Sequence, residues 1–306
     1  MVYPHGSIKG EVGSFITLKG KDNKVFPFSK MNFAHLVIDA DGTRKLDQSI
    51  KPGNNLGEYN GSITIQKGTL GTGNYSITGN PSGFIRIKSG GNLTIAGNLG
   101  FPLGFGDIYL DRFSTVTYGK IGNQDIDSLN FWNLAITGFG SKSCTGKTTV
   151  NGILSIGFGK LITHNQLTLL SNNKGTATVS TLCTSCNIEG NLKMQRMIPH
   201  ENASLLAGGW LRGNSFVSWA DSLNEKGISG GNFPKNQIKT FQYFSEDSLN
   251  NGKGGFFSLP NLSDSIWVGK GVVVNTDTNK ALTFLLDGEI FKGDTTFHFG
   301  SSTHLK

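Results

Sequence analysis

The chain has 306 residues with 28 Lys or Arg and 21 Asp or Glu, which gives a formal net charge of +7 and a pI near 9.2. The basic residues are scattered, with no basic helix and no interleaved aromatic platform, so the sequence excludes a typical nucleic-acid-binding protein. No apolar run approaches the length of a membrane-spanning helix, so we expect no direct membrane span. A charged fraction of 16% and 43 glycines favour a chain that turns often.

The first two-thirds of the chain consists of short runs in which apolar and small or polar residues alternate, and Gly or Asn closes each run. Alternation over four to six residues between such punctuation marks is typical of short β-strands. In chain order these runs include residues 14–18, 61–65, 75–79, 84–87, 92–97, 129–138, 149–157, 161–169 and 176–180. Helical periodicity is absent from this part.

Part of this pattern occurs twice. Matching positions 98 residues apart are Asn32 and Asn130, Phe33 and Phe131, Leu36 and Leu134, and Ile38 and Ile136. Further along, Ile63 and Ile65 match Leu154 and Ile156. We therefore predict an internal duplication, with copies at about 14–113 and 114–182.

A repeat of about a hundred residues built from short strands fits several stacked coils of about twenty residues each. Stacked coils bury a continuous core that a single coil cannot bury. We predict an all-β protein with a parallel β-helix or β-solenoid over residues 1–190. Two consecutive sandwich domains are the alternative, because strand spacing alone does not separate the two folds.

After residue 187 the sequence changes. Residues 187–199 form a longer strand pattern closed by Pro199, and large aromatic residues become more frequent, among them Trp210, Trp219 and Trp267. The following strand patterns are separated by Gly or Asp turns. We predict a separate antiparallel β-sandwich over residues 191–306 and expect it to be truncated, because the pattern at 297–302 ends in mid-strand.

Several of these strings resemble a known class of proteins. Residues 129–138 and 149–156 resemble the repeats of large cell-surface and adhesin-like proteins that Bacteroidota export through the type IX secretion system. Residues 188–199, 268–272 and 288–299 are similar to the β-rich module that often follows those repeats, although residues 203–206 lack the Trp-Arg pair usual there. The resemblance implies a secreted protein or one on the outer cell surface, and no signal peptide is visible in this chain.

Candidate catalytic residues are few. In the pattern at 107–112, alternation places Asp107, Tyr109 and Asp111 on one face of a strand. Two carboxylates two strand steps apart would suit a polysaccharide-cleaving site or a calcium site, with Arg112 and Tyr118 as the nearest helpers. The alternative is a polar outward face.

Binding residues are suggested by aromatic side chains, since sugar rings stack on flat, rigid rings. Trp132 and Tyr109 are our candidates for contact with polysaccharide, and Trp132 matches Ala34 in the first copy, so the core does not require an aromatic there. The motif at 140–148 resembles a phosphate-binding loop, but its spacing is wrong and no helix follows, so we reject it. The sequence indicates no cofactor.

The three cysteines and six histidines do not form a metal-site pattern. Cys144 matches Leu46 and is expected to point into the core. Cys183 and Cys186 have the spacing of a metal or redox pair, but no second pair exists for a zinc site, and a local disulfide is the leading interpretation for an exported protein.

Five short motifs resemble the Asp-Ser/Thr-hydrophobic acceptor of O-glycosylation in those bacteria. Their acceptor hydroxyls belong to Ser128, Ser222, Ser248, Ser265 and Thr295. The alternative is that Asp-Ser and Asp-Thr begin turns.

Together these features predict a non-catalytic structural or adhesive segment that contacts polysaccharide or cell-surface glycans. A β-helix lyase, epimerase or hydrolase is one alternative, and a carbohydrate-binding module is another. Because the ends of a solenoid expose unpaired strands, we also expect end-to-end self-association.

Overall fold

The computed structural model describes residues 8–9, 13–53, 60–98, 100–180 and 182–198, together with short strands further on. Those strands are 204–206, 211–212, 217–218, 238–244, 256–258, 265–266, 272–276 and 282–290. The chain divides into two units, residues 1–166 with 177–187 and residues 167–176 with 188–306. In the described residues nearly all regular structure is β, and η1 (Phe28–Lys30) is a single 3-10 turn.

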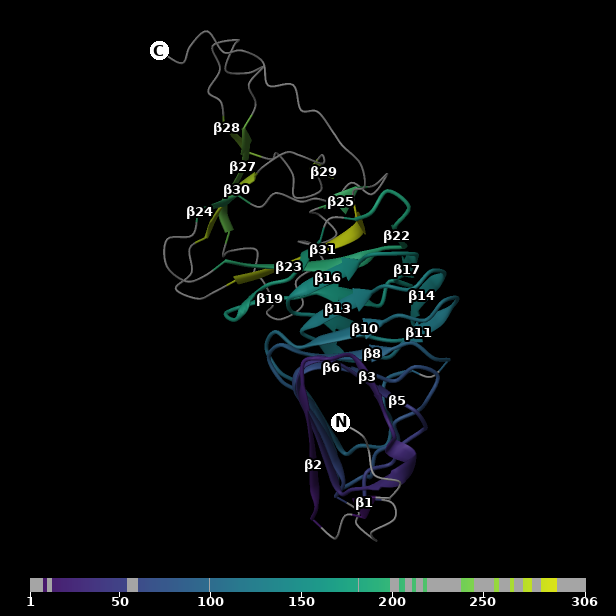
Figure 1. The fold of residues 1–306 in the computed structure, drawn as a ribbon. Helices are drawn as coiled ribbons and strands as arrows, with labels where there is room; N and C mark the ends of the chain where they lie inside the picture. Colours follow the sequence, from purple (N-terminus) through teal and green to yellow (C-terminus); the bar gives the residue numbers. More distant parts are fainter. Residues whose placement is uncertain are drawn as a thin grey trace. The chain divides into compact units, whose positions relative to one another are not determined.

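Parallel strands of the first unit stack into a β-solenoid, which confirms the principal fold prediction and is incompatible with consecutive sandwiches. The described strands make about eight turns. Figure 1 shows β8, β10, β13 and β16 stacked in chain order. The main parallel sheet contains β2 (Phe15–Gly20), β3 (Lys24–Phe26), β5 (His35–Leu46), β6 (Ser62–Gly71), β7 (Phe84–Ile87), β8 (Gly91–Ile95), β9 (Asp107–Leu110), β10 (Thr115–Tyr118), β13 (Asn133–Ile136), β16 (Ile153–Ile156) and β21 (Thr178–Val179).

The remaining strands up to residue 190 are mostly shorter, and those within residues 167–176 belong to the second unit. They are β1 (Ile8–Lys9), which pairs with β4 (Met31–Asn32), and β11 (Gln124–Ile126), β12 (Asn130–Phe131), β14 (Ser141–Cys144), β15 (Thr148–Val150), β17 (Lys160–Ile162), β18 (Leu167–Leu169), β19 (Ser171–Asn172), β20 (Gly175–Thr176) and β22 (Asn187–Glu189). From β10 onward each turn of the solenoid carries three short strands. Corresponding residues on successive turns, such as Val116, Leu134 and Leu154, are roughly 20 residues apart, as expected.

Two columns of aliphatic side chains form the core, and they are buried except at the two ends of the first column, where Ile16 is half-buried and Ile108 is 36% exposed. The first joins Ile16, Leu36, Ile63, Ile85 and Ile108 through register pairs, and the second joins Leu70, Leu93, Val116, Leu134 and Leu154. Most of these side chains are fully buried. Because the side chains of a strand alternate, every second residue points into this shared interior and its neighbours point outward.

Leu36 and Leu134, which match in the duplicated sequence, lie in different columns. Leu36 pairs with Ile63, whereas Leu134 pairs with Leu154. Positions that match between the two copies can therefore occupy different columns of the solenoid.

Some corners bring backbones so close that only glycine fits. Gly140 has a φ of +85°, and an added Cβ would lie 2.6 Å from the carbonyl carbon of Gly122. Gly159 on the next turn has a φ of +73°, and its Cβ would lie 2.4 Å from the carbonyl oxygen of Gly140. Glycine supplies both the left-handed conformation and the space.

Two buried cations hold corners from inside. The Lys142 ammonium donates to the carbonyl oxygens of Gly122 and Phe139 at 2.8 and 3.0 Å. The Arg44 guanidinium donates to the carbonyl oxygens of Asp22 and, at 2.8 Å, Lys19. Charged donors suit such carbonyls because each ammonium or guanidinium carries several N–H groups.

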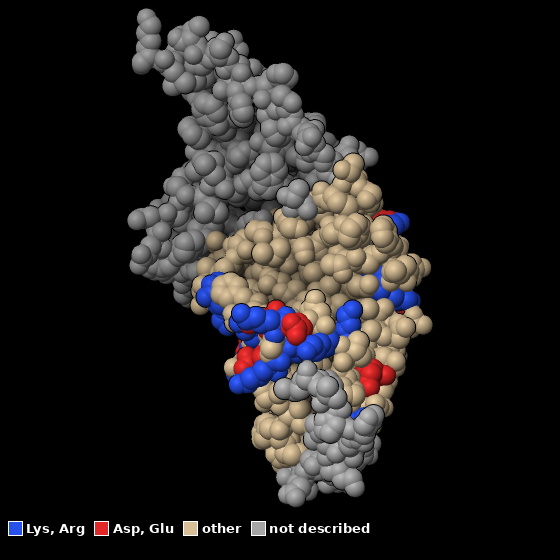
Figure 2. Space-filling view, in the orientation of Figure 1, with Lys and Arg blue, Asp and Glu red and all other residues tan. Residues whose placement is uncertain are grey.

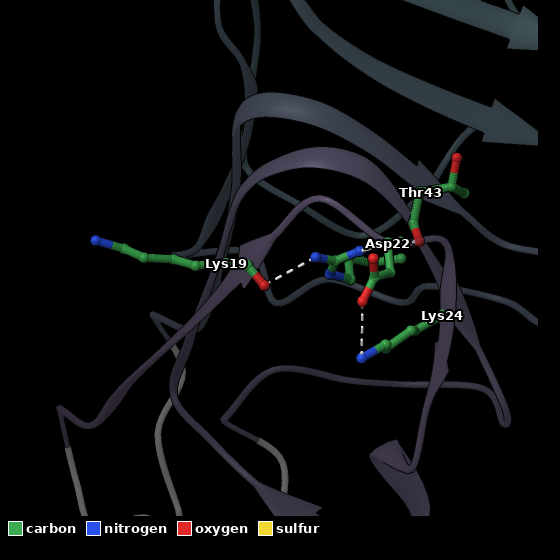
Figure 3. A network of polar contacts seen from close by, with 5 residues as sticks. Lys19, Asp22, Lys24 and Thr43 are labelled. Carbon is green, nitrogen blue, oxygen red and sulfur yellow. Dashed lines mark hydrogen bonds and ion pairs between the residues drawn. The ribbon is translucent and has the colours of Figure 1, made fainter. Parts of the chain in front are cut away.

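Figure 3 shows polar contacts at the Arg44 corner, with Lys19, Asp22, Lys24 and Thr43 drawn as sticks. The Lys19 carbonyl accepts a hydrogen bond from the Arg44 guanidinium, and the Asp22 carboxylate forms an ion pair with the Lys24 ammonium at 3.1 Å. The neighbouring basic residues Arg44 and Lys45 lie on opposite sides of the strand, with Arg44 buried and Lys45 exposed.

In the second unit the described strands beyond residue 198 pair antiparallel. They are β24 (Ser204–Leu206), β25 (Leu211–Arg212), β26 (Val217–Ser218), β27 (Ile238–Phe244), β28 (Phe256–Ser258), β29 (Ser265–Ile266), β30 (Val272–Thr276) and β31 (Leu282–Ile290). β23 (Leu192–Ile198) pairs parallel with β18 and antiparallel with β31. Packing of these strands as a β-sandwich stays a prediction. The single strand predicted over 187–199 is wrong, because Gly190 with a φ of +86° separates β22 from β23.

Candidate functional site

Several exposed or half-buried aromatic residues gather with charged neighbours on adjacent turns of the solenoid, in a group that we call the aromatic strip. It consists of Phe84, Arg86, Tyr109, Asp111, Arg112, Phe113 and Trp132. The strip begins on β7 and β9, follows the turn after β9, and ends at the residue between β12 and β13. All its elements belong to the first unit.

The β7–β9 pairing builds the first half of the strip. Arg86 and Tyr109 are register partners, and the Arg86 guanidinium lies 5.7 Å from the centre of the Tyr109 ring. Phe84 meets the same ring edge-on with the centroids 6.1 Å apart. Arg86 Nε also donates to the Asp111 carboxylate at 2.9 Å, which holds the guanidinium beside the ring. Tyr109 stays 44% exposed, so one side of this arrangement is open to solvent.

The second half depends on an unusual turn. The Ser114 amide donates to the Asp111 carbonyl at 3.0 Å, so residues 111–114 form a tight turn, and Phe113 takes a φ of +63°. One turn of the solenoid earlier, the same hydrogen bond joins Gly91 to Lys88, and the corresponding residue is Gly90 with a φ of +78°. Phe113 therefore occupies a position whose geometry favours glycine, at a cost of about 1–2 kcal/mol.

Burial does not explain this strained phenylalanine, since its side chain is 54% exposed. The ring meets Trp132 edge-on with the centroids 5.6 Å apart, and the Arg112 guanidinium lies 4.7 Å from the Phe113 centroid and 5.6 Å from that of Trp132. Strained residues of this kind concentrate at ligand-binding and active sites, where an exposed side chain has a role outside the fold.

The following turn leaves room for the Trp132 indole. A Cβ on Gly152 would lie 2.6 Å from the indole Nε1, so any larger residue would displace the ring. The Gly152 amide donates to the Trp132 carbonyl at 2.7 Å. Trp132 is half-buried, with one part of the ring packed on the turn and the rest accessible to a ligand.

The structure brings both predicted binding residues, Tyr109 and Trp132, into this strip. The sequence alone did not predict that Phe84, Arg86 or Phe113 belongs to it. Phe84 and Arg86 lie on another turn, so only the β7–β9 register shows their proximity. The one local signal was the tight turn at 111–114, in which a phenylalanine replaces the glycine that turn geometry favours.

The structure separates the predicted carboxylates from one of their expected helpers, Tyr118. Asp107 is exposed, and Asp111 is engaged by Arg86. Tyr118, expected beside them, is instead fully buried and donates to the Asp127 carboxylate at 3.0 Å. Burial, and then the nearby Asp127 charge, raise the pKa of Tyr118 well above 10.

The cysteines occupy structural positions. Cys183 and Cys186 are joined in a disulfide, and Cys144 is buried, as predicted. Burial raises the pKa of the Cys144 thiol to about 11, so this thiol is a poor nucleophile. Within the described ranges no three His, Cys, Asp or Glu side chains gather in a way that could hold a metal ion.

Of the five predicted glycosylation acceptors, the structure describes the side chain of Ser128 alone. Ser128 is exposed, and its hydroxyl donates to the Lys147 carbonyl at 2.7 Å, so it also holds the corner. Ser265 begins β29. Ser222, Ser248 and Thr295 lie outside the described residues.

No family model, curated protein or solved structure matches this chain. In the part of the chain that the structure describes, no helix has the length and apolar character to cross a membrane.

Proposed function

We propose that this chain is a non-catalytic structural and adhesive segment of a secreted or cell-surface protein, and that it contacts polysaccharide through the aromatic strip. The observation that carries the proposal is Phe113, an exposed ring held in a strained turn beside Trp132. Aromatic rings offer a large apolar area at low entropic cost, and the neighbouring arginines donate hydrogen bonds to hydroxyl groups.

Other features support the structural part of the proposal. Solenoid coils stack through nearest-neighbour contacts, which suits a stalk that displays another module. We propose that the expected β-sandwich over 191–306 is that module, and that copies of the solenoid associate end to end. The Cys183–Cys186 disulfide and the resemblance to exported Bacteroidota repeats both support a location outside the cytosol.

Binding to a panel of soluble polysaccharides, measured by titration calorimetry, tests the adhesive role. We expect Trp132→Ala to weaken binding about tenfold or more, because it removes the ring that both Phe113 and Arg112 contact. Phe15→Ala is the matched control, since Phe15 is a 69% exposed aromatic residue on β2 that packs on His35 instead. Equal affinity of the Trp132 variant and the native chain would remove the strip from the proposal.

A polysaccharide-cleaving enzyme is the second candidate, and the exposed Asp107 near Asp111 is the observation that favours it. Incubation with the same polysaccharides, followed by reducing-end and unsaturated-product assays, separates the two functions. Turnover that disappears in Asp111→Ala would contradict the non-catalytic proposal.

A further inference from the structure

A second group of exposed apolar side chains lies on successive turns, at another corner of the solenoid. Ile121, Phe139 and Phe158, which we call the corner ladder, are 81%, 60% and 47% exposed. Each of them directly precedes a glycine, and the backbones of these three glycines pack closely from one turn to the next. The Gly122 amide also donates a hydrogen bond to the Phe139 carbonyl on the next turn at 2.9 Å. The Phe139 and Phe158 rings are 5.0 Å apart.

The aromatic strip and the corner ladder border the same strands. Phe113 precedes β10 and Ile121 follows it, while Trp132 precedes β13 and Phe139 follows it. Four-residue strands span about 13 Å. Two successive turns thus carry an exposed or half-buried apolar residue at each end of one strand.

The accessible outward side chains of the strands between these borders are uncharged, and we call this surface the β8–β16 face. Its members are Asn92, Thr94, Thr115, Asn133, Ala135, Ile153 and Ser155, and Thr117, which alternates with the inward residues of β10, is only 6% exposed. On the side seen in Figure 2, the area over β13 and β16 shows no Lys, Arg, Asp or Glu, and charged side chains gather over turns nearer the N-terminus.

Hydrogen bonds between turns fix the polar groups of this face. Thr117 Oγ1 donates to Asn92 Oδ1 at 3.0 Å, and Asn133 Oδ1 accepts from the Ile153 amide at 2.8 Å. Because these amides are already oriented, a ligand that bonds to them loses little additional side-chain entropy. The corner is also rigid, since the buried Lys142 ammonium binds the Phe139 carbonyl from inside.

We propose that the ligand is an extended, uncharged polysaccharide that lies along the stacked turns on the β8–β16 face, between the aromatic strip and the corner ladder. This inference rests on the proposed function and adds the ligand class and a second contact surface. Flat rings and an aliphatic side chain along both borders fit the apolar faces of sugar rings, and the amides and hydroxyls between them fit sugar hydroxyls. The named members of the face carry no charge, and the arginines of the aromatic strip lie at its border, where Arg86 is already paired with Asp111. This favours a neutral polymer over an acidic one, because an acidic chain would lose hydration over the face itself without gaining a cation among those members.

The test compares matched neutral and anionic polymers in 1 M NaCl, where the Debye length is about 3 Å and the net charge of the protein contributes little. The pairs are hydroxyethylcellulose with carboxymethylcellulose, and dextran with dextran sulfate, each titrated calorimetrically against the full chain. We expect a neutral polymer to bind and its anionic partner to bind at least about tenfold more weakly. Phe139→Ala combined with Phe158→Ala should weaken binding of the neutral polymer about tenfold, and Phe15→Ala should leave it unchanged.

The outcomes distinguish this inference from the proposed function. If Trp132→Ala weakens binding but the Phe139 and Phe158 double variant does not, the corner ladder is overturned and the strip stands. Stronger binding of the anionic polymers in 1 M NaCl overturns the ligand class alone. If no neutral polymer binds, the inference fails, and binding of an anionic polymer that depends on Trp132 would still support the proposed function. Circular dichroism of the double variant verifies that it keeps the native β spectrum.

Discussion

At the scale of single residues, the molecule places some side chains against their local preference. Phe113 occupies a left-handed turn position, and Arg44 and Lys142 lie inside the solenoid although cations are rarely fully buried. The two cations satisfy carbonyl oxygens at corners, so they have a structural purpose. Phe113 is mostly exposed, and its contacts are with two other exposed or half-buried side chains.

Substitution of Phe113 separates strain from ring contact. Phe113→Gly relieves a left-handed conformation that costs about 1–2 kcal/mol and loses ring contacts of about 0.5–1.5 kcal/mol. We expect its free energy of unfolding to stay equal to that of the native chain or to rise by up to about 1 kcal/mol, while glycan binding weakens. Phe113→Ala removes the same ring but keeps the strain, so it should be about 1 kcal/mol less stable than the glycine variant. Urea denaturation measures both, and a less stable glycine variant would show that Phe113 stabilises the fold.

At the scale of strands, short strands need hydrogen bonds that connect them to neighbouring segments, and the pair of Tyr118 and Asp127 provides such bonds. Tyr118 at the end of β10 donates to Asp127, which follows β11, and the same carboxylate accepts from the Phe101 amide at 2.6 Å. The Asp127 amide donates back to the Tyr118 hydroxyl at 3.3 Å. The pair therefore connects β10, β11 and the segment around Phe101.

This pair predicts a pH dependence. The pKa of Tyr118 is higher in the folded chain than its ordinary value of 10, so its contribution to stability is complete below pH 10 and is lost as the pH rises toward the folded pKa. Tyr118→Phe should cost about 1–3 kcal/mol at pH 8, because it leaves buried partners unsatisfied. Above pH 10 this difference should shrink by up to about 1.4 kcal/mol per pH unit. Urea denaturation from pH 8 to 11 measures it, and a constant difference would contradict the assignment.

At the scale of the whole molecule, the stacking of turns buries a common core, and the strands at an end of the stack have an edge that no further turn covers. Among the described strands, β2 and β3 pair with β5 alone, and the residues there include the exposed Lys19, Lys21 and Lys24. Charged side chains on an edge strand discourage pairing with another chain. The proposed end-to-end association must therefore overcome repulsion at this edge.

We expect the association to depend on salt. In sedimentation velocity experiments the chain should be largely monomeric in 0.1 M NaCl and should associate in 1 M NaCl, because the Debye length falls from about 10 to about 3 Å. Replacing Lys19, Lys21 and Lys24 together by Ser should shift association to lower salt. Association that weakens with salt would indicate an electrostatic contact elsewhere.

The sequence by itself determined that the chain forms short β-strands with alternating apolar residues and that Gly or Asn forms the corners between them. Alternation and Gly or Asn punctuation are local signals, and they were enough to predict a β-solenoid, turns of about twenty residues, the burial of Cys144, and Tyr109 and Trp132 as exposed or half-buried aromatic residues. The register between turns was decided by the tertiary structure. Corner chemistry is similar at every turn, so a sequence match between Leu36 and Leu134 does not show that both lie in one column. Contacts such as those of Phe113 with Trp132, or of Arg44 with Lys19, depend on which turns stack together, and hydrogen bonds between residues about twenty positions apart set that register.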